Sequence, residues 1–342
     1  MKHIFENIGI SVIGCALPSY MEDIKETLLK NGVEERQARR LIKSIGFSKL
    51  KIAKDKYTSV DFCEHAVKNA VSKLNYDLNK IDGLIFVTQT PDYLIPGNAY
   101  LLQDRLSLRK DILIFDSIQG CSGFVHALLI ASSWIKTNCC NNVLICCGDS
   151  LTPKSDLTQK GNVAIFGEGA GFAILSKIDG IKPGYFTGRS DGSSYEAIIN
   201  YKSGIKEARQ GFLFEEGEYL SGEVLASYVL GDGGIEEVKS LLALANLTKD
   251  DIEKFVCHQA NKSMLQGLAM MLDVDTDKVP FLSENTGNTS SASIPIAFSE
   301  NKDLFTNFDK YYVLSAFGTG LSSYSSIQDL SKATILDPVY LD

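Results

Sequence analysis

The sequence predicts an α/β fold made of two similar halves, and three observations lead to this prediction. The chain has 342 residues, which is enough for two domains or for one duplicated unit. Short apolar segments typical of strands alternate with longer segments whose apolar residues recur at helical spacing. Three landmarks of the first half return in the same order in the second half. We therefore expect one half over residues 1–177 and a second half over residues 178–342.

The first half is expected to be a series of strands and helices around one cysteine. The stretch MKHIFENIGISVIGCALP is expected to form a first strand, and a second begins near Leu84 and precedes a helix in GNAYLLQDRLSL. The apolar run DILIF then predicts a buried strand, because it is short and rich in β-branched and aromatic residues. A helix after Gly123 leads to another strand in NVLICCGD, and NVAIFGEGAGFAILSK indicates two strands joined at glycines.

The second half begins with a segment that has no clean periodicity. Residues 191–229 are rich in Gly, Ser and Glu, so we expect an insertion or a set of loops that cover a site. Regular patterns return after it, in GIEEVKSLLALANL, DIEKFVCHQANKSMLQGLAMML, SIPIAFSE and KYYVLSAFGTGLSSYSSI.

The two halves correspond through their landmarks. GLIFVTQTP matches KFVCHQAN, since each is a strand that ends in polar residues. GCSGFVHALLIAS matches GNTSSASIPIAFS as a Gly-rich turn into a helix of small residues, and NVAIFGEGAGFAIL matches YYVLSAFGTGLSSYSSI as a strand–glycine–strand hairpin. Each identity is weak, so the shared order carries the prediction of a pseudo-twofold duplication.

Composition excludes several classes of protein. A hydrophobic content of 44% is that of a globular chain with a large core, and a net charge of −8 argues against nucleic-acid binding. No apolar run approaches the roughly 18 residues of a membrane span, and the N-terminus does not resemble a signal peptide. Eight cysteines occur without any CxxC spacing, which indicates reduced thiols in the cytoplasm and no zinc site.

Cys121 lies between two glycines, where the strand DILIF turns into the next helix. The unpaired N–H groups and the positive end of a helix dipole at such a position favour a thiolate, which would make Cys121 a nucleophile. The alternative is a buried packing thiol, because free cysteine is among the most buried residue types. The residues around it leave both interpretations open.

His258 and Asn288 are the candidate partners of Cys121. Each follows an expected strand or lies in a Gly-rich turn of the second half, where α/β proteins place their chemistry, and a duplicated unit would bring these ends together. The chain has four histidines, and His126 is expected to lie on the face of the helix after Cys121.

Five motifs occur together in one order: GCSGFVHAL, NVAIFGEGAG, HQAN, GNTSSASIP and FGTGLSS. In this they resemble the thiolase superfamily, and within it the β-ketoacyl-acyl carrier protein synthase III family, over roughly residues 81–326. The resemblance implies a thiolase-like five-layered αβαβα duplicated fold and a homodimer. The extended N-terminal segment is more similar to specialised members of secondary metabolism than to the enzyme that initiates fatty acid biosynthesis.

The resemblance also implies the chemistry. Cys121 would accept the acyl group, with His258 and Asn288 as its catalytic partners, and the N–H groups of Cys121 and Gly318 would form the oxyanion hole. A malonyl thioester would then lose carbon dioxide and attack the acyl-Cys121 carbonyl. The resemblance implies no metal or redox cofactor, since the thioesters of coenzyme A or phosphopantetheine are substrates.

Substrate binding departs from the family pattern in several places. Arg40 stands near the position of a tryptophan that stacks on the coenzyme A adenine, and Lys160 replaces an arginine on the phosphate side. Asn261 of HQAN is expected to bind substrate, and Lys262 stands one position before the expected carrier-docking arginine. Coenzyme A and carrier protein both remain possible donors, and Arg40 has the alternative of a plain surface arginine.

Ile95 aligns with a bulky residue that the family inserts from the partner subunit into the acyl pocket. A smaller side chain there leaves room for a longer or branched acyl group, and the alternative is an ordinary isoleucine of a dimer core.

Three functions follow from these residues. The first is decarboxylative condensation of an acyl-CoA or acyl carrier protein with malonyl-ACP or malonyl-CoA. The second is transfer of the acyl group from Cys121 to a different acceptor in a specialised pathway, and the third is a non-catalytic partner subunit. The sequence does not predict the acyl chain, the donor or the pathway.

Overall fold

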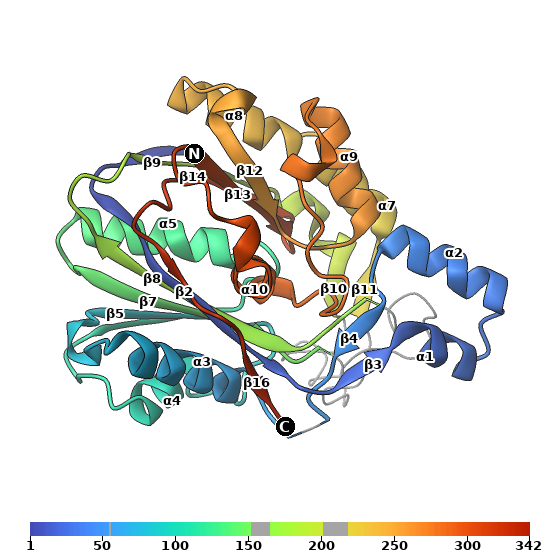
Figure 1. Ribbon diagram of the computed structural model, residues 1–342, viewed down its shortest axis with the longest axis horizontal. Coiled ribbons are helices and arrows are strands. Elements are labelled where there is room, and N and C mark those ends of the chain that lie inside the picture. The colour runs from blue at the N-terminus through green and yellow to red at the C-terminus, as the bar shows by residue number, and fades with distance from the viewer. Residues whose placement is uncertain (55, 152–164, 201–217) are drawn as a thin grey trace.

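The computed structural model describes residues 1–54, 56–151, 165–200 and 218–342. Within these ranges, two sheets are stacked with helices between them and on both outer faces (Figure 1). The first sheet has the order β15-β2-β8-β7-β5-β6, with β16 also paired to β2, and the second has the order β1-β9-β14-β13-β12. The strands of the first sheet are β2 (Ile8–Pro18), β5 (Gly83–Val87), β6 (Leu113–Ser117), β7 (Asn142–Asp149), β8 (Gly169–Lys177), β15 (Thr334–Ile335) and β16 (Val339–Leu341). Those of the second are β1 (Lys2–Phe5), β9 (Gly184–Ser190), β12 (Ile252–Cys257), β13 (Tyr311–Gly318) and β14 (Ser322–Gln328).

Helices form three layers around these sheets (Figure 1). α3 and α4 cover the outer face of the first sheet, α5 and α10 lie between the sheets, and α7, α8 and α9 cover the outer face of the second. The bounds are α3 (Ser59–Leu74), α4 (Asn98–Arg105), α5 (Gly123–Lys136), α7 (Gly222–Leu230), α8 (Ile235–Ala245), α9 (Lys262–Leu272) and α10 (Ser293–Glu300). The five-layered αβαβα arrangement is confirmed.

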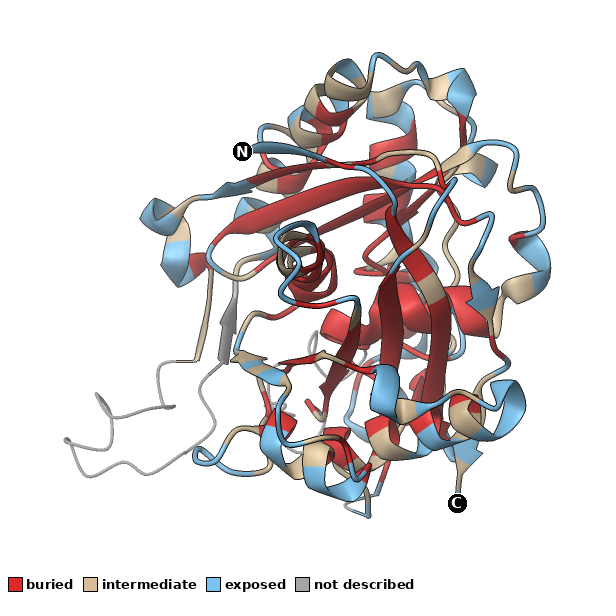
Figure 2. Ribbon diagram, turned by 90° about the vertical axis from the view of Figure 1, so that its left-hand side faces the viewer, coloured by how far each residue is buried: buried red, intermediate tan, exposed pale blue. Residues whose placement is uncertain are grey.

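The central helices lie where their sequences require. α5 and α10 bury residues on nearly every side, and a helix that is apolar all round must be enclosed by protein. Figure 2 shows the buried residues concentrated on these helices and on the strands that sandwich them.

The two ends of the chain cross between the sheets. β1 pairs with β9 in the second sheet, although it comes first in the sequence. β15 and β16 come last, yet both pair in parallel with β2 in the first sheet. The proposed boundary between halves falls directly after β8, which ends at Lys177, and it stays a prediction.

Three expectations need correction. The stretch MKHIFENIGISVIGCALP, expected to form one strand, forms β1 and β2, which belong to different sheets. The run DILIF was expected to be buried, but β6 is the last strand of its sheet, with Leu113 43% exposed and Phe115 40% exposed. An apolar run is typical of burial on both faces but does not distinguish a central strand from an edge strand that meets a partner. The segment 191–229, expected to be loops, also contains the short strands β10 (Ile198–Asn200) and β11 (Glu218–Leu220) and the helix α7.

The N-terminal segment forms a small unit beside the second half. It consists of β3 (Met21–Asp23), α1 (Ile24–Lys30), α2 (Glu35–Ile45) and β4 (Lys49–Lys51). β3 pairs with β4, and α2 packs against α9 (Figure 1).

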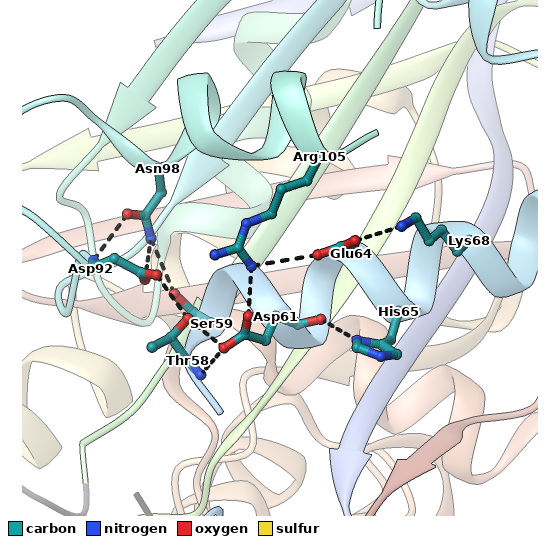
Figure 3. A network of polar contacts seen from close by, with 9 residues as sticks. All are labelled: Thr58, Ser59, Asp61, Glu64, His65, Lys68, Asp92, Asn98 and Arg105. Atoms are coloured by element: carbon teal, nitrogen blue, oxygen red, sulfur yellow. Dashed lines mark hydrogen bonds and ion pairs between the residues drawn. The ribbon is translucent and has the colours of Figure 1, made fainter. Parts of the chain in front are cut away.

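A polar network anchors the loop between β5 and α4 to the start of α3 (Figure 3). Asn98 is fully buried; its Oδ1 accepts a hydrogen bond from the Asp92 N–H at 3.0 Å and its Nδ2 donates to Ser59 Oγ at 3.2 Å. Arg105 pairs with Asp61 at 2.6 Å. These contacts fix both ends of α4 and thereby the loop that precedes it.

Candidate active site

Cys121 lies in the turn between β6 and α5, directly before the first turn of the helix. Its side chain is half-buried, and Sγ lies 3.7 Å from Ser290 Oγ of the second half. Ser122, the residue before α5, makes no side-chain cap, so the first N–H groups of the helix are directed at this turn without a capping oxygen from that residue. This position favours a thiolate.

The other cysteines lie in different surroundings. Burial raises the pKa of Cys257 to about 12 and that of Cys140 to about 11, so both stay thiols at neutral pH. Cys63 and Cys147 are also buried, and burial raises their pKa values well above the ordinary range. Among these five, only Cys121 lines the cavity described below.

A set of polar contacts holds the turn of Cys121 against the second half. Gln119 Nε2 donates to Ser122 Oγ at 3.1 Å and to Ser322 Oγ at 2.9 Å. His126 reaches the same amide from α5, with Nδ1 2.5 Å from Gln119 Oε1, and its ring stacks on Tyr324. His126 therefore supports the turn from the helix face on which it was expected.

His258 follows β12 and is 2% exposed. Burial lowers its pKa to about 3, so the imidazole is neutral at physiological pH. Ser293 Oγ lies 2.7 Å from Nδ1 and also accepts from the Gln259 N–H at 3.4 Å. With Ser293 donating to Nδ1, the imidazole proton is on Nε2, which is the tautomer that can donate toward the cavity.

Asn288 is held in a tight turn that fixes the direction of its amide. Its backbone N–H donates to the Ile165 carbonyl at 2.7 Å, and its Oδ1 accepts from the Ser290 N–H at 2.9 Å. Because Oδ1 is engaged in this way, Nδ2 is the group left to donate. Gly287, at φ 79°, lies so close to Gly167 that a Cβ would come within 2.9 Å of the Gly167 nitrogen, which explains the glycine before Asn288.

The three side chains converge on one cavity of about 80 Å³. Besides Cys121, His258 and Asn288, it is lined by Gln89, Leu151, Ile165, Phe166, Ile198, Leu225, Ala260, Asn261, Met264, Phe317, Gly318 and Thr319. Gly318 touches the nucleophile, since a Cβ there would lie 3.0 Å from Cys121 Cβ. A neutral imidazole and an amide, both with a proton to donate, thus share one pocket with a thiol.

A buried carboxylate braces the base of this pocket. Asp149, at the end of β7, is 1% exposed and accepts from the Gln89 N–H at 2.7 Å. Its other oxygen accepts from Ser291 Oγ at 2.9 Å. Burial raises its pKa, although these hydrogen bonds oppose the shift. Asp149 therefore links the loop after β5 to the turn that carries Asn288.

The remaining predicted residues lie outside or at the rim of the cavity. Asn261 lines it and caps α9, its Oδ1 accepting from the Met264 N–H at 2.8 Å. Arg40 and Lys262 are exposed on α2 and at the start of α9, and Ile95 is 87% exposed in the loop before α4. Lys160 lies outside the described residues.

Sequence reasoning missed the residues that orient the central three. Ser290 and Ser293 were noted only as part of a Gly-rich turn, and Gln89 only as a polar residue at a strand end. The available signal was the run of hydroxyl residues in NTSSAS, which is unusual for the start of a buried helix.

We also searched the described residues for a membrane-spanning helix and for a metal site. No helix among them has the length and apolar character needed to span a bilayer. Nor does this part of the chain gather three or more His, Cys, Asp or Glu side chains in a possible metal site.

Two family models match parts of this chain. The family model for 3-oxoacyl-[acyl-carrier-protein] synthase III matches residues 115–192, and the model for the C-terminal part of that family matches residues 242–329. These matches include Cys121, His258 and Asn288.

Two curated relatives and one solved structure extend the similarity over the chain. A β-ketoacyl-[acyl-carrier-protein] synthase III of Sulfurovum sp. is 30% identical, covering 84% of this chain and 86% of the relative. That of Staphylococcus aureus strain Newman is 28% identical, covering 92% and 96%. The crystal structure of a 3-oxoacyl-(acyl-carrier protein) synthase from Burkholderia xenovorans LB400 superimposes with a TM-score of 0.92 at 26% identity, covering 100% of this chain and 99% of that one.

Proposed function

Since the chain belongs to the 3-oxoacyl-[acyl-carrier-protein] synthase III family of acyl-transferring condensing enzymes, we propose that Cys121 accepts an acyl group, which a malonyl thioester then extends. The observation that carries this proposal is the convergence of Cys121, His258 and Asn288 on one cavity. A single nucleophile beside two fixed donors suits a reaction with two half-steps.

In the first half-step the Cys121 thiolate attacks the carbonyl carbon of an acyl thioester. The bond from that carbon to the donor sulfur breaks, and the donor thiol leaves with the proton that Cys121 gave up. The N–H groups of Cys121 and Gly318 are proposed to bind the tetrahedral oxyanion, and losing one such donor typically costs about 2.7–4 kcal/mol.

In the second half-step a malonyl thioester loses its carboxylate as carbon dioxide. The electron pair remains as an enolate, whose oxygen receives hydrogen bonds from His258 Nε2 and Asn288 Nδ2. Because His258 is neutral and buried, it stabilises this charge by donating a hydrogen bond and leaves the enolate unprotonated. The enolate carbon then attacks the acyl carbonyl and Cys121 leaves as a thiolate. These steps need no metal or redox cofactor.

Substrates are proposed to arrive as acyl-CoA or acyl carrier protein and as malonyl-ACP or malonyl-CoA. Lys262 begins α9, next to Asn261 at the rim of the cavity, and a Cβ on Gly46 at the end of α2 would lie 2.4 Å from Lys262 Cβ. The exposed face of α2 adds Arg36, Arg40 and Lys43. On a chain of net charge −8, this local concentration of cations supports docking of an acidic carrier protein. Arg40 remains the residue proposed to stack on an adenine if coenzyme A is the donor.

We also propose a homodimer in the cytoplasm. The edge strand β6 and the loop before α4 expose apolar side chains, including Ile95 and Ile118. Ile95 of one subunit is proposed to reach the acyl end of its neighbour's pocket. The structure pairs none of the eight cysteines in a disulfide, which supports a reducing compartment. Membership of a specialised pathway of secondary metabolism stays a proposal that rests on the N-terminal unit.

Transfer of the acyl group to a non-malonyl acceptor is the less favoured alternative. Such a transfer has no use for two donors aimed at an enolate oxygen, whereas the condensation uses both.

The first test measures intact mass after incubation with acyl-CoA and acyl carrier protein donors, with and without malonyl thioester. We expect an adduct on Cys121 that disappears as β-ketoacyl product forms. Cys121→Ala should form no adduct. His258→Ala and Asn288→Ala should keep the adduct but release carbon dioxide about 10²–10³-fold more slowly. An adduct that survives in Cys121→Ala would reject the nucleophile, and an adduct unaffected by malonyl donor would favour the alternative acceptor.

A further inference from the structure

Gln89 and Thr319 are polar residues that line the cavity and have no part in the proposed condensation, and Gln89 has the amide that lies beside the nucleophile. His258 and Asn288 serve the malonyl step, and Asn261 Oδ1 caps α9. Gln89 follows β5, and its backbone is held from below by the buried Asp149 carboxylate. Its side chain is therefore presented to the cavity from a fixed backbone.

The amide of Gln89 lies directly beside the nucleophile. Nε2 donates to Ser290 Oγ at 3.0 Å, and that same oxygen lies 3.7 Å from Cys121 Sγ. On the other side, a Cβ on Gly120 would meet Gln89 Cδ and Nε2 at 2.6 Å. The glycine before Cys121 thus gives space to the Gln89 amide, which covers the turn of the nucleophile.

This position puts a polar amide beside the nucleophile in a small pocket with a mainly apolar lining. The cavity has a volume of about 80 Å³, far below the roughly 300–1,000 Å³ of pockets for drug-sized ligands. The side chains of Leu151, Ile165 and Phe166, which line the same cavity, are apolar and have no hydrogen-bond donor. The hydrogen bonds of Gln89 with other described residues engage its backbone N–H and Nε2, so none of them occupies the acceptor Oε1.

We propose that Gln89 is a specificity-determining residue that selects a short acyl group with a hydroxyl on its second or third carbon. The oxygen of such a hydroxyl is three or four covalent bonds from Cys121 Sγ. The Gln89 amide is linked to the same sulfur through Ser290 Oγ, so the hydroxyl can reach it. An acyl group with that hydroxyl gives Oε1 a donor. A plain alkyl chain instead displaces water from the amide, and it offers no hydrogen bond in place of the one that the water made. This inference rests on the proposed function, because it assumes that Cys121 carries the acyl group.

The test compares acyl groups of equal length. The rate of adduct formation on Cys121 is measured with butanoyl-CoA, 2-hydroxybutanoyl-CoA and 3-hydroxybutanoyl-CoA. The unaltered protein should prefer one of the hydroxylated groups by about tenfold in kcat/KM. Gln89→Met keeps the length of the side chain but removes its hydrogen bonds, so it should abolish or reverse this preference. Carbon dioxide release from malonyl thioester by the unaltered protein tests the proposed function separately.

The chain offers a matched control in Gln103, a half-buried glutamine of α4 whose Nε2 donates to the Arg109 carbonyl at 2.8 Å. Gln103→Met should leave the preference intact. Equal rates for the three acyl groups, or the same preference in Gln89→Met, would overturn the inference while adducts and carbon dioxide release uphold the proposed function. Absence of any adduct with every donor would overturn both.

Discussion

At the scale of single residues, two serines orient the three central side chains. Ser293 hydrogen-bonds His258 Nδ1, which suits a proton on Nε2, and the Ser290 N–H engages Asn288 Oδ1 so that Nδ2 is left to donate. Ser290 also contacts Cys121 Sγ. Neither serine is a catalytic residue in itself, because each acts by orienting another group.

The buried imidazole should make stability depend on pH. Burial lowers the pKa of His258 to about 3, whereas a histidine in the unfolded chain titrates near 6.5. Between these values the unfolded state binds a proton that the native state does not, so the free energy of unfolding falls as the pH drops below 6.5. From pH 7 to pH 5, the contribution of His258 should lower the free energy of unfolding by about 2 kcal/mol. Urea unfolding of the unaltered protein and of His258→Asn at both pH values measures the difference, and equal losses in the two proteins would contradict the assignment.

At the scale of elements, the sequence predicted site residues where a reactive residue type stands at the end of a recognisable strand or turn. Cys121, His258 and Asn288 were found because each lies where a strand ends or a Gly-rich turn begins. Gln89 was not found in this way. The local sequence TQT does not indicate which of the three side chains faces a cavity formed by both halves. The exposure of β6 was also missed, since an edge strand that meets a partner has the same composition as a buried one.

α2 carries a prediction of its own. Arg36 and Lys43 lie on its exposed face, opposite Ala38 and Ile45, which are buried. Arg36→Ser/Lys43→Ser should lower kcat/KM for carrier-delivered acyl groups about tenfold at low salt, with the difference shrinking as salt is added. Loading from acyl-CoA should change less than threefold. The same charge change at Lys239 and Lys332, both exposed and outside the cavity, is the control, and an equal effect there would reject a specific docking face.

At the scale of the whole molecule, one part of the surface exposes large apolar side chains. Leu94 and Ile95, in the loop before α4, and Ile118, directly after the edge strand β6, are 73%, 87% and 85% exposed. Apolar exposure of this kind is typical of an interface, and we expect one here. A second copy of the chain, paired along β6, would cover it.

Sedimentation velocity tests this pairing. The unaltered protein should sediment as a dimer, and Ile118→Asp should shift it to a monomer because a carboxylate would be buried in the interface. Leu304→Asp places the same charge at another exposed aliphatic residue, 49% exposed, and should leave the dimer intact. A dimer that persists in Ile118→Asp would locate the interface elsewhere.

The crossing of the terminal strands has a consequence for how the protein is made. β2 receives β15 and β16 as neighbours, and the Ser19 N–H donates to the Leu341 carbonyl at 2.7 Å. The sheet whose strand β6 leads into the turn of Cys121 is therefore incomplete until residues 334–341 have left the ribosome. During most of synthesis, β2 lacks two of its partner strands, so the apolar surface of the nascent chain is exposed to other chains. We expect chaperone dependence during translation to be set by the arrival of residues 334–341, long after Cys121 has emerged.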